Sequence, residues 1–320
     1  MSLLGRRSST PRLAPELDDT KLAKACTQVA LPSLRGQLDI RGDLLETVIK
    51  DAGTDWDRRG HRIAQLARTA DASLARDWLR RRPNDPDAQL FSAWVQVVRG
   101  RWEGGLADPQ ATFGCCHRAA ELSPADPGPW VALLGAMRLL RRPTAEVFAV
   151  WREIVARDRW NREAHLQMLG YLSPEECGSY SRVLEFLDAV LPAMPADAPA
   201  VGIELTAMVE NFRRSLSAGG AVALGAGRHW TRRSEAAALE RGLADWAQPG
   251  FLWHAAALSD LNLLGYALAQ ANLLGQAAPV FRAIGATVTP WPWGLDGDPL
   301  QEFTHAQSRA LRAAGGNGRR

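Results

Sequence analysis

Apolar residues recur at helical spacing through most of the chain, in stretches separated by short turns that contain proline or glycine. Leu74 and Trp78 fall on one face of a predicted helix, and Leu90, Trp94 and Val98 fall on one face of the next. A single helix pair cannot bury such a face alone and must stack on neighbouring pairs. The pattern therefore predicts an all-α fold, an irregular α-solenoid of stacked helix pairs.

Two of the predicted turns share the same arrangement of proline and aspartate. They are the segments 83–86 (PNDP) and 124–127 (PADP), which align at an offset of 41 residues. Proline stops the outgoing helix, and the aspartate is expected to cap the incoming one. We therefore expect Asp85 and Asp126 to begin helices at equivalent positions of successive units.

Composition shifts divide the chain into six predicted parts. These are a disordered N-terminus (1–15), an N-terminal helical cap (16–70), degenerate repeats (71–216), a Gly-rich linker (217–233), a C-terminal helical region with one clear repeat (234–314) and a loose tail (315–320). A polar, Gly-rich insert at 103–109 interrupts the repeats, and the proline- and tryptophan-rich segment 290–294 is expected to be extended.

The units resemble tetratricopeptide repeats, which are helix–turn–helix modules of about 34 residues. The residues that carry the resemblance are Ala119, Pro124, Trp130 and Leu133 in the middle of the chain and Leu264, Gly265, Ala277 and Phe281 in the clearest, late copy, where Leu261 replaces the early Trp. The match covers roughly residues 71–214 and 251–286. It implies a protein or peptide partner, bound by polar side chains of the first helix of each unit. The segment 54–59 also resembles that of actinobacterial helical proteins that carry no assigned activity.

Composition and charge narrow the classes of function. The net charge is +3, with 46% hydrophobic residues, and no stretch of 18 uninterrupted apolar residues occurs. We expect no membrane span, and the four scattered cysteines fit a reducing, cytoplasmic location. Arginine clusters such as Arg58-Arg59-Arg62 fit solvated helix ends, where cations favour the helix dipole. If the arginine clusters lie together on one surface, they would instead bind an acidic partner or nucleic acid.

No motif of catalysis, metal binding or cofactor binding emerges. Cys115-Cys116-His117 lacks the spacing of a zinc site, and Cys116 falls on an apolar face, so core packing is favoured. The six histidines are scattered singly, and the Gly-rich segment lacks the phosphate-loop pattern. We expect no cofactor, no metal and no catalytic residue that the sequence alone identifies.

The C-terminal part carries the candidate binding residues. His229-Trp230-Thr231-Arg232-Arg233 places aromatic rings among cations, which suits a base or a peptide. Trp291 and Trp293 either cap the core or form an exposed aromatic patch. The complete candidate set is His229, Trp230, Arg232, Arg233, His254, Asn262, Gln270, Trp291 and Trp293.

The sequence favours a non-enzymatic scaffold or adaptor for protein–protein interaction. One alternative is a nucleic-acid-associated regulator that uses the arginine clusters. The other is an enzyme whose site lies where the repeats meet the C-terminal region. A pocket that brings His229 or His254 within hydrogen-bonding reach of Asp245 or Asp260 would support the enzyme.

Overall fold

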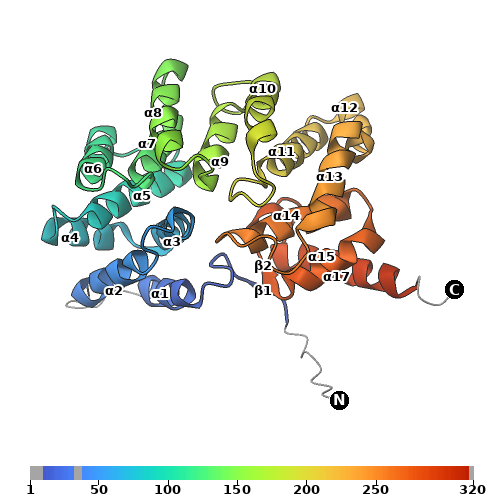
Figure 1. The fold of residues 1–320 in the computed structure, drawn as a ribbon, viewed down its shortest axis with the longest axis horizontal. Helices are drawn as coiled ribbons and strands as arrows, with labels where there is room; N and C mark the ends of the chain where they lie inside the picture. Colours follow the sequence, from blue (N-terminus) through green and yellow to red (C-terminus); the bar gives the residue numbers. More distant parts are fainter. Residues whose placement is uncertain (1–9, 32–37, 317–320) are drawn as a thin grey trace, which may run out of the picture. The chain divides into compact units, whose positions relative to one another are not determined.

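The chain folds almost entirely into α-helices. The computed structural model describes residues 10–31 and 38–316. They form two compact units, which we call the N-terminal unit (Asp19–Val201) and the C-terminal unit (residues 10–18 together with residues 202–316). Figure 1 shows the succession of helices along the chain, coloured from blue to red.

The N-terminal unit is built of helices alone. They are α1 (Thr20–Ala30), α2 (Leu38–Lys50), α3 (Trp56–Thr69), α4 (Ala72–Arg81), α5 (Pro86–Glu103), α6 (Pro109–Leu122), α7 (Gly128–Leu139), α8 (Thr144–Arg157), α9 (Arg162–Tyr171), α10 (Tyr180–Val190) and the 3-10 turn η1 (Leu191–Ala193). The predicted insert at 103–109 is the connection between α5 and α6.

Four helices of this unit contact one another in a closed series. Helix α3 contacts α5, α5 contacts α7, α7 contacts α9, and α9 returns to contact α3. We call them the central helices. Helices α4, α6 and α8 alternate with them along the chain: α4 packs on α5, α6 packs on α5 and α7, and α8 packs on α7. Residues far apart in sequence therefore meet where the central helices face one another.

The turn before α5 is capped by Asp85, as its sequence predicts, whereas in the turn before α7 Asp126 lies one residue ahead of the N-cap, Pro127. A side-chain oxygen of Asp85 accepts from the backbone nitrogen of Asp87 at 2.9 Å at the start of α5. Asp126 Oδ1 accepts from the backbone nitrogen of Gly128 at 2.7 Å at the start of α7. Each bond satisfies a backbone donor that has no partner inside the helix.

The core of the N-terminal unit holds the apolar faces identified in the sequence. Trp78 and Trp94 are almost completely buried, and so is Cys116, whose thiol pKa is raised by burial. Gly135 marks a close approach of helices, because a Cβ atom there would lie 3.0 Å from Val97 Cγ1. The same Cβ atom would lie 3.7 Å from Gln167 Oε1 of α9.

The C-terminal unit adds a short strand pair to its helices. Its elements are β1 (Arg12–Leu13), α11 (Ile203–Ser217), α12 (Gly220–Ala226), the 3-10 turn η2 (His229–Thr231), α13 (Arg233–Asp245), α14 (Ala257–Gln270), α15 (Leu274–Ile284), β2 (Thr287–Val288), α16 (Pro290–Trp293) and α17 (Pro299–Gly316). Strands β1 and β2 pair in parallel, with Arg12 opposite Thr287.

The structure corrects the expectation of disorder for part of the N-terminus. Residues 10–15 of the segment 1–15 include β1, and Ala14 is fully buried. Backbone pairing with β2, far along the chain, orders this segment although its composition is polar. Residues 1–9, and residues 317–320 of the predicted tail, lie outside the described residues. Residues 315–316 belong to α17.

Two further segments differ from their predicted form. The predicted linker 217–233 contains α12 and η2, and the compact units divide at Val201 and Gly202 and not at residue 216. The segment 290–294 forms the single turn α16, in which Trp291 alone keeps an extended backbone and the Trp291–Pro292 peptide bond is cis. Within residues 10–31 and 38–316, no helix combines the length and the apolar character needed to cross a membrane.

Candidate binding site in the N-terminal unit

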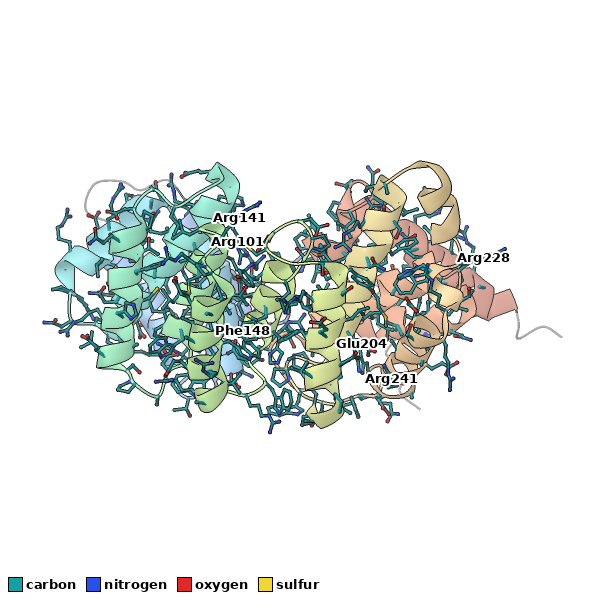
Figure 2. The ribbon with its side chains drawn as sticks, turned by 90° about the horizontal axis from the view of Figure 1, so that it is seen from above. Arg101, Arg141, Phe148, Glu204, Arg228 and Arg241 are labelled. Atoms are coloured by element: carbon teal, nitrogen blue, oxygen red, sulfur yellow. The ribbon has the colours of Figure 1, made fainter. Side chains whose placement is uncertain are left out.

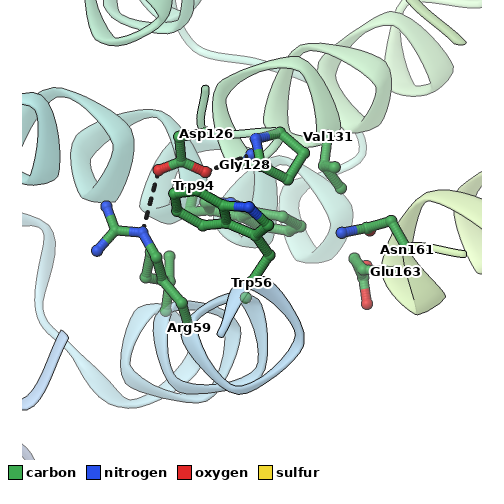
Figure 3. Close-up of a pocket in the computed structure, with 11 residues that line it drawn as sticks. Trp56, Arg59, Trp94, Asp126, Gly128, Val131, Asn161 and Glu163 are labelled. Carbon is green, nitrogen blue, oxygen red and sulfur yellow. Dashed lines mark hydrogen bonds and ion pairs between the residues drawn. The ribbon is translucent and has the colours of Figure 1, made fainter. Parts of the chain in front are cut away.

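A small pocket lies among the central helices, and all four of them contribute to its wall (Figure 3). Its lining includes Trp56, Arg59 and Gly60 of α3, Trp94 of α5, Val131 of α7 and Glu163 of α9. The volume open to the centre of a water molecule is about 20 Å³, which is enough for about one water. The pocket therefore suits a small group projecting from a larger ligand.

Arg59 forms one wall of the pocket and is held by two carboxylates. Its Nε donates to Asp126 Oδ2 at 3.0 Å, and its Nη2 donates to Asp87 Oδ1 (Figure 3 shows the Asp126 contact). Burial by itself lowers the pKa of Arg59, but the carboxylates of Asp126 and Asp87 outweigh it, so the pKa is raised. Arg59 therefore stays charged, and its ion pairs connect α3 to α5 and to the turn before α7.

Glu163 is the carboxylate of the pocket that faces the other arginines. Its Oε1 accepts from Gln167 Nε2 at 2.6 Å. Burial raises the pKa of Glu163, but the charges of Arg101, Arg68 and Arg138 more than offset burial and hold the pKa below its usual value. Glu163 is therefore ionised at neutral pH, although its side chain is half-buried.

These three arginines form a second feature of the site, which we call the arginine cluster (Arg68, Arg101 and Arg138). Each lies in the last turn of its helix, α3, α5 and α7 respectively. Arg101 is exposed in part, and desolvation of the rest of its side chain lowers its pKa; the charge of Glu163 opposes that effect, and the like charges of Arg138 and Arg68 add to it. Figure 2, which draws the side chains as sticks, labels Arg101 of the arginine cluster and Arg141, which follows α7.

Arg138 is fully engaged within the unit. Its Nε donates to Glu176 Oε2 at 2.9 Å and its Nη2 donates to Glu176 Oε1, while Nη1 donates to Gln167 Oε1 at 2.5 Å. A Cβ atom at Gly170 would lie 1.9 Å from Arg138 Nη2. Glycine at this position therefore lets the guanidinium lie directly on α9.

Five of the nine residues singled out in the sequence are buried in the C-terminal unit. His229 and Trp230 pack on Phe212, with ring centroids 5.4 and 5.5 Å from it. Burial lowers the pKa of His229, and the charge of Glu235 opposes that effect. This pair of rings belongs to the core, and Thr231, Arg232 and Arg233 of that segment are exposed.

Asn262 and Trp293 meet inside the same unit. Asn262 Oδ1 accepts from Trp293 Nε1 at 2.9 Å, and its Nδ2 donates to the carbonyl oxygens of Leu258 and Thr287. Asn262 is fully buried, so its amide anchors the segment after β2 to α14. Trp291 is partly exposed, and Gln270 is exposed and donates to Asp296 Oδ2 at 3.0 Å.

His254 makes the contact that the enzyme alternative requires. Its Nε2 lies 3.4 Å from Asp260 Oδ2. Both side chains are completely buried, so no substrate can reach them in this structure. A carboxylate that touches an imidazole in this way equally orients a buried histidine.

The sequence offered only a partial signal for the site in the N-terminal unit. Arg59 and Arg62 were identified as part of a solvated helix end, but both are buried. Arg62 pairs with Asp19 at 2.7 Å and with Asp51 at 3.0 Å. The sequence did not mark four residues of this site, which are Trp56, Arg68, Arg101 and Glu163. They come from helices α3, α5 and α9 and meet only through the contacts of the central helices.

Comparison of the chain with protein-family models, with curated proteins and with solved structures finds no match. Among the described residues, no three His, Cys, Asp or Glu side chains come together in a group able to hold a metal ion.

Proposed function

We propose that this protein is a non-enzymatic scaffold or adaptor, a tetratricopeptide-like solenoid that binds a protein or peptide partner through the central helices of its N-terminal unit. One observation carries the proposal: residues of four helices, each separated from the next along the chain by another helix, line one pocket. A surface shared in this way suits an elongated ligand that touches several helices in turn.

The polar side chains of the pocket already have partners within the unit, which supports ligand binding as the function and not catalysis. Arg59, Asp87 and Asp126 are paired with one another. Asn161 Oδ1 accepts from the backbone nitrogen of Ala164, and its Nδ2 donates to Asp158. Such groups fix the shape of the pocket, and the rings of Trp56 and Trp94 supply apolar area for a ligand.

A pocket-filling substitution tests the proposal. Gly60 lines the pocket within α3, and a Cβ atom there would meet nothing within 4 Å. Gly60→Leu should therefore occupy the pocket without disturbing the helix. Gly114→Leu is the matched control, because Gly114 also lies within a helix, α6, with open space around its Cβ.

The experiment is a selection of random peptides displayed against the full chain, followed by calorimetry of the enriched peptides. We expect peptides that bind with one-to-one stoichiometry, lose about tenfold or more in affinity with Gly60→Leu and bind Gly114→Leu unchanged. Failure to enrich any peptide, or equal binding to both variants, contradicts the proposal. Salt-sensitive binding of random single-stranded DNA with no peptide enriched favours the nucleic-acid alternative.

A further inference from the structure

The arginine cluster brings like charges together at the ends of three neighbouring helices. Arg68, Arg101 and Arg138 stand in the last turns of α3, α5 and α7, where cations interact favourably with the helix dipoles. The charges of all three arginines act on Glu163, and those of Arg68 and Arg138 act on Arg101. The helix dipoles explain why each arginine is tolerated, but they do not remove the repulsion among the three.

Only one member of the arginine cluster is satisfied inside the unit. Arg138 forms a bidentate pair with Glu176 and a hydrogen bond to Gln167. Among the described residues, neither Arg68 nor Arg101 has a carboxylate within 4 Å, and both are exposed to solvent. Glu163 accepts its hydrogen bond from Gln167.

The balance of charge indicates what a ligand must supply. Arg138 pairs with Glu176, whereas Arg68 and Arg101 lie in the last turns of the contacting helices α3 and α5 without an ion pair of their own among the described residues. The remaining carboxylate, Glu163, is linked to the arginine cluster through Gln167, which binds both Glu163 and Arg138, so three positive charges stand against two negative ones. A carboxylate matches the fork of donors on a guanidinium and makes charge-assisted hydrogen bonds with it. A polyanion with several phosphates would meet repulsion from the ionised Glu163, whereas one carboxylate restores neutrality.

We propose that Arg68 and Arg101 together bind the carboxylate of an Asp or Glu side chain in a partner peptide that lies along the central helices. The inference rests on the proposed function and names the chemistry of the partner. The chain's own segments outside the described residues do not fit this role. Residues 1–9, 32–37 and 317–320 contain arginines and no acidic side chain.

The test compares two double variants in the peptide selection. Arg68→Gln/Arg101→Gln removes both unsatisfied cations. Arg76→Gln/Arg152→Gln makes the same change of charge on α4 and α8, outside the central helices, at two exposed arginines that form no ion pair among the described residues. Circular dichroism and thermal unfolding should show both variants folded, because all four side chains are exposed.

With the unaltered chain and with Arg76→Gln/Arg152→Gln, we expect the enriched peptides to share an Asp or Glu. Replacing that residue with Asn or Gln in a synthetic peptide with blocked ends should weaken binding at least about tenfold. The same replacement should have no effect on binding to Arg68→Gln/Arg101→Gln.

The outcomes separate this inference from the proposed function. Enriched peptides that bind the pocket but lack an acidic residue overturn the inference and leave the proposed function standing. The inference also fails, and the proposed function stands, if the enriched peptides bind Arg68→Gln/Arg101→Gln as tightly as the unaltered chain. Absence of any enriched peptide overturns both. If single-stranded DNA binds the chain and is lost with Arg68→Gln/Arg101→Gln, the cations serve phosphates and the carboxylate proposal fails.

Discussion

Arg59 Nε donates a hydrogen bond to Asp126 Oδ2 at 3.0 Å, and both side chains are buried. The contact ties α3 to the turn before α7. The same guanidinium also binds Asp87 at the start of α5. One arginine therefore fixes the spacing of three of the four central helices around the pocket.

Removal of one of the two carboxylates that pair with Arg59 should lower the stability of the protein, because the buried guanidinium loses a partner. Asp126→Ala leaves Arg59 with one partner and removes the bond to the backbone nitrogen of Gly128. We expect the free energy of unfolding in denaturant to fall by about 3–5 kcal/mol, as when other buried ion pairs lose one member. The control is Asp71→Ala, which removes an exposed cap from α4 and should cost about 1 kcal/mol. Equal losses for the two variants would show that Asp126 acts only as a cap.

Asn262 should be essential to the stability of the C-terminal unit. Asn262→Leu keeps the size of the side chain but leaves the buried indole nitrogen of Trp293 without its acceptor. Each buried polar group left unsatisfied costs about 1–3 kcal/mol, and the fluorescence of Trp293 should change as its surroundings loosen. Gln276→Leu, at an exposed position of α15, is the control and should have little effect. Unchanged stability of Asn262→Leu would contradict the role of the amide.

The stability of the N-terminal unit should depend on pH through His165. Burial lowers the pKa of His165, while the hydrogen bond between its Nδ1 and the carbonyl oxygen of Asn161, at 2.8 Å, opposes that effect. The folded pKa lies below the unfolded value of about 6.5, so the unfolded chain binds more protons below that pH. His165 therefore contributes its full stability above about pH 6.5 and loses it as the pH falls through the folded pKa.

Denaturant unfolding of the unaltered chain and of His165→Gln, at about pH 7.5 and about pH 5.5, checks this dependence. The loss of stability on acidification should be smaller in the variant, because its side chain at position 165 does not titrate. An equal loss in both chains would mean that other groups carry the whole pH dependence.

Helix packing at Gly135 leaves no room for a larger side chain. Gly135→Leu should destabilise the unit by about 1–3 kcal/mol, because its Cβ would press on Val97 and its further atoms would need space that Gln167 occupies. Gly114→Leu should be neutral or slightly stabilising, since leucine favours a helix more than glycine does. Thermal unfolding of the two variants compares them directly, and a neutral Gly135→Leu would mean that α5 and α9 move apart easily.

Local patterns in the sequence determined the helices and the way that several of them begin. Asp85 was predicted as a cap because proline and aspartate act within a few residues of their own position, and the structure confirms it. Asp126 was predicted in the same way, but it lies one residue before the N-cap of α7, Pro127, and its side chain binds the backbone nitrogen of Gly128. Burial of Trp78 and Trp94 was also predicted, because helical periodicity places them on apolar faces.

Tertiary structure alone decided which polar side chains are buried and which residues meet. Asn262 and His229 have polar side chains, yet both are buried. Asn262 binds Trp293 of α16, and His229 packs against Phe212 of α11. The pairing of β1 with β2 and the contact of α3 with α9 likewise join segments that share no local signal. Helical periodicity reports only the face on which a residue lies. Whether that face meets water or another helix depends on contacts between remote segments, and these decide the pocket and the arginine cluster.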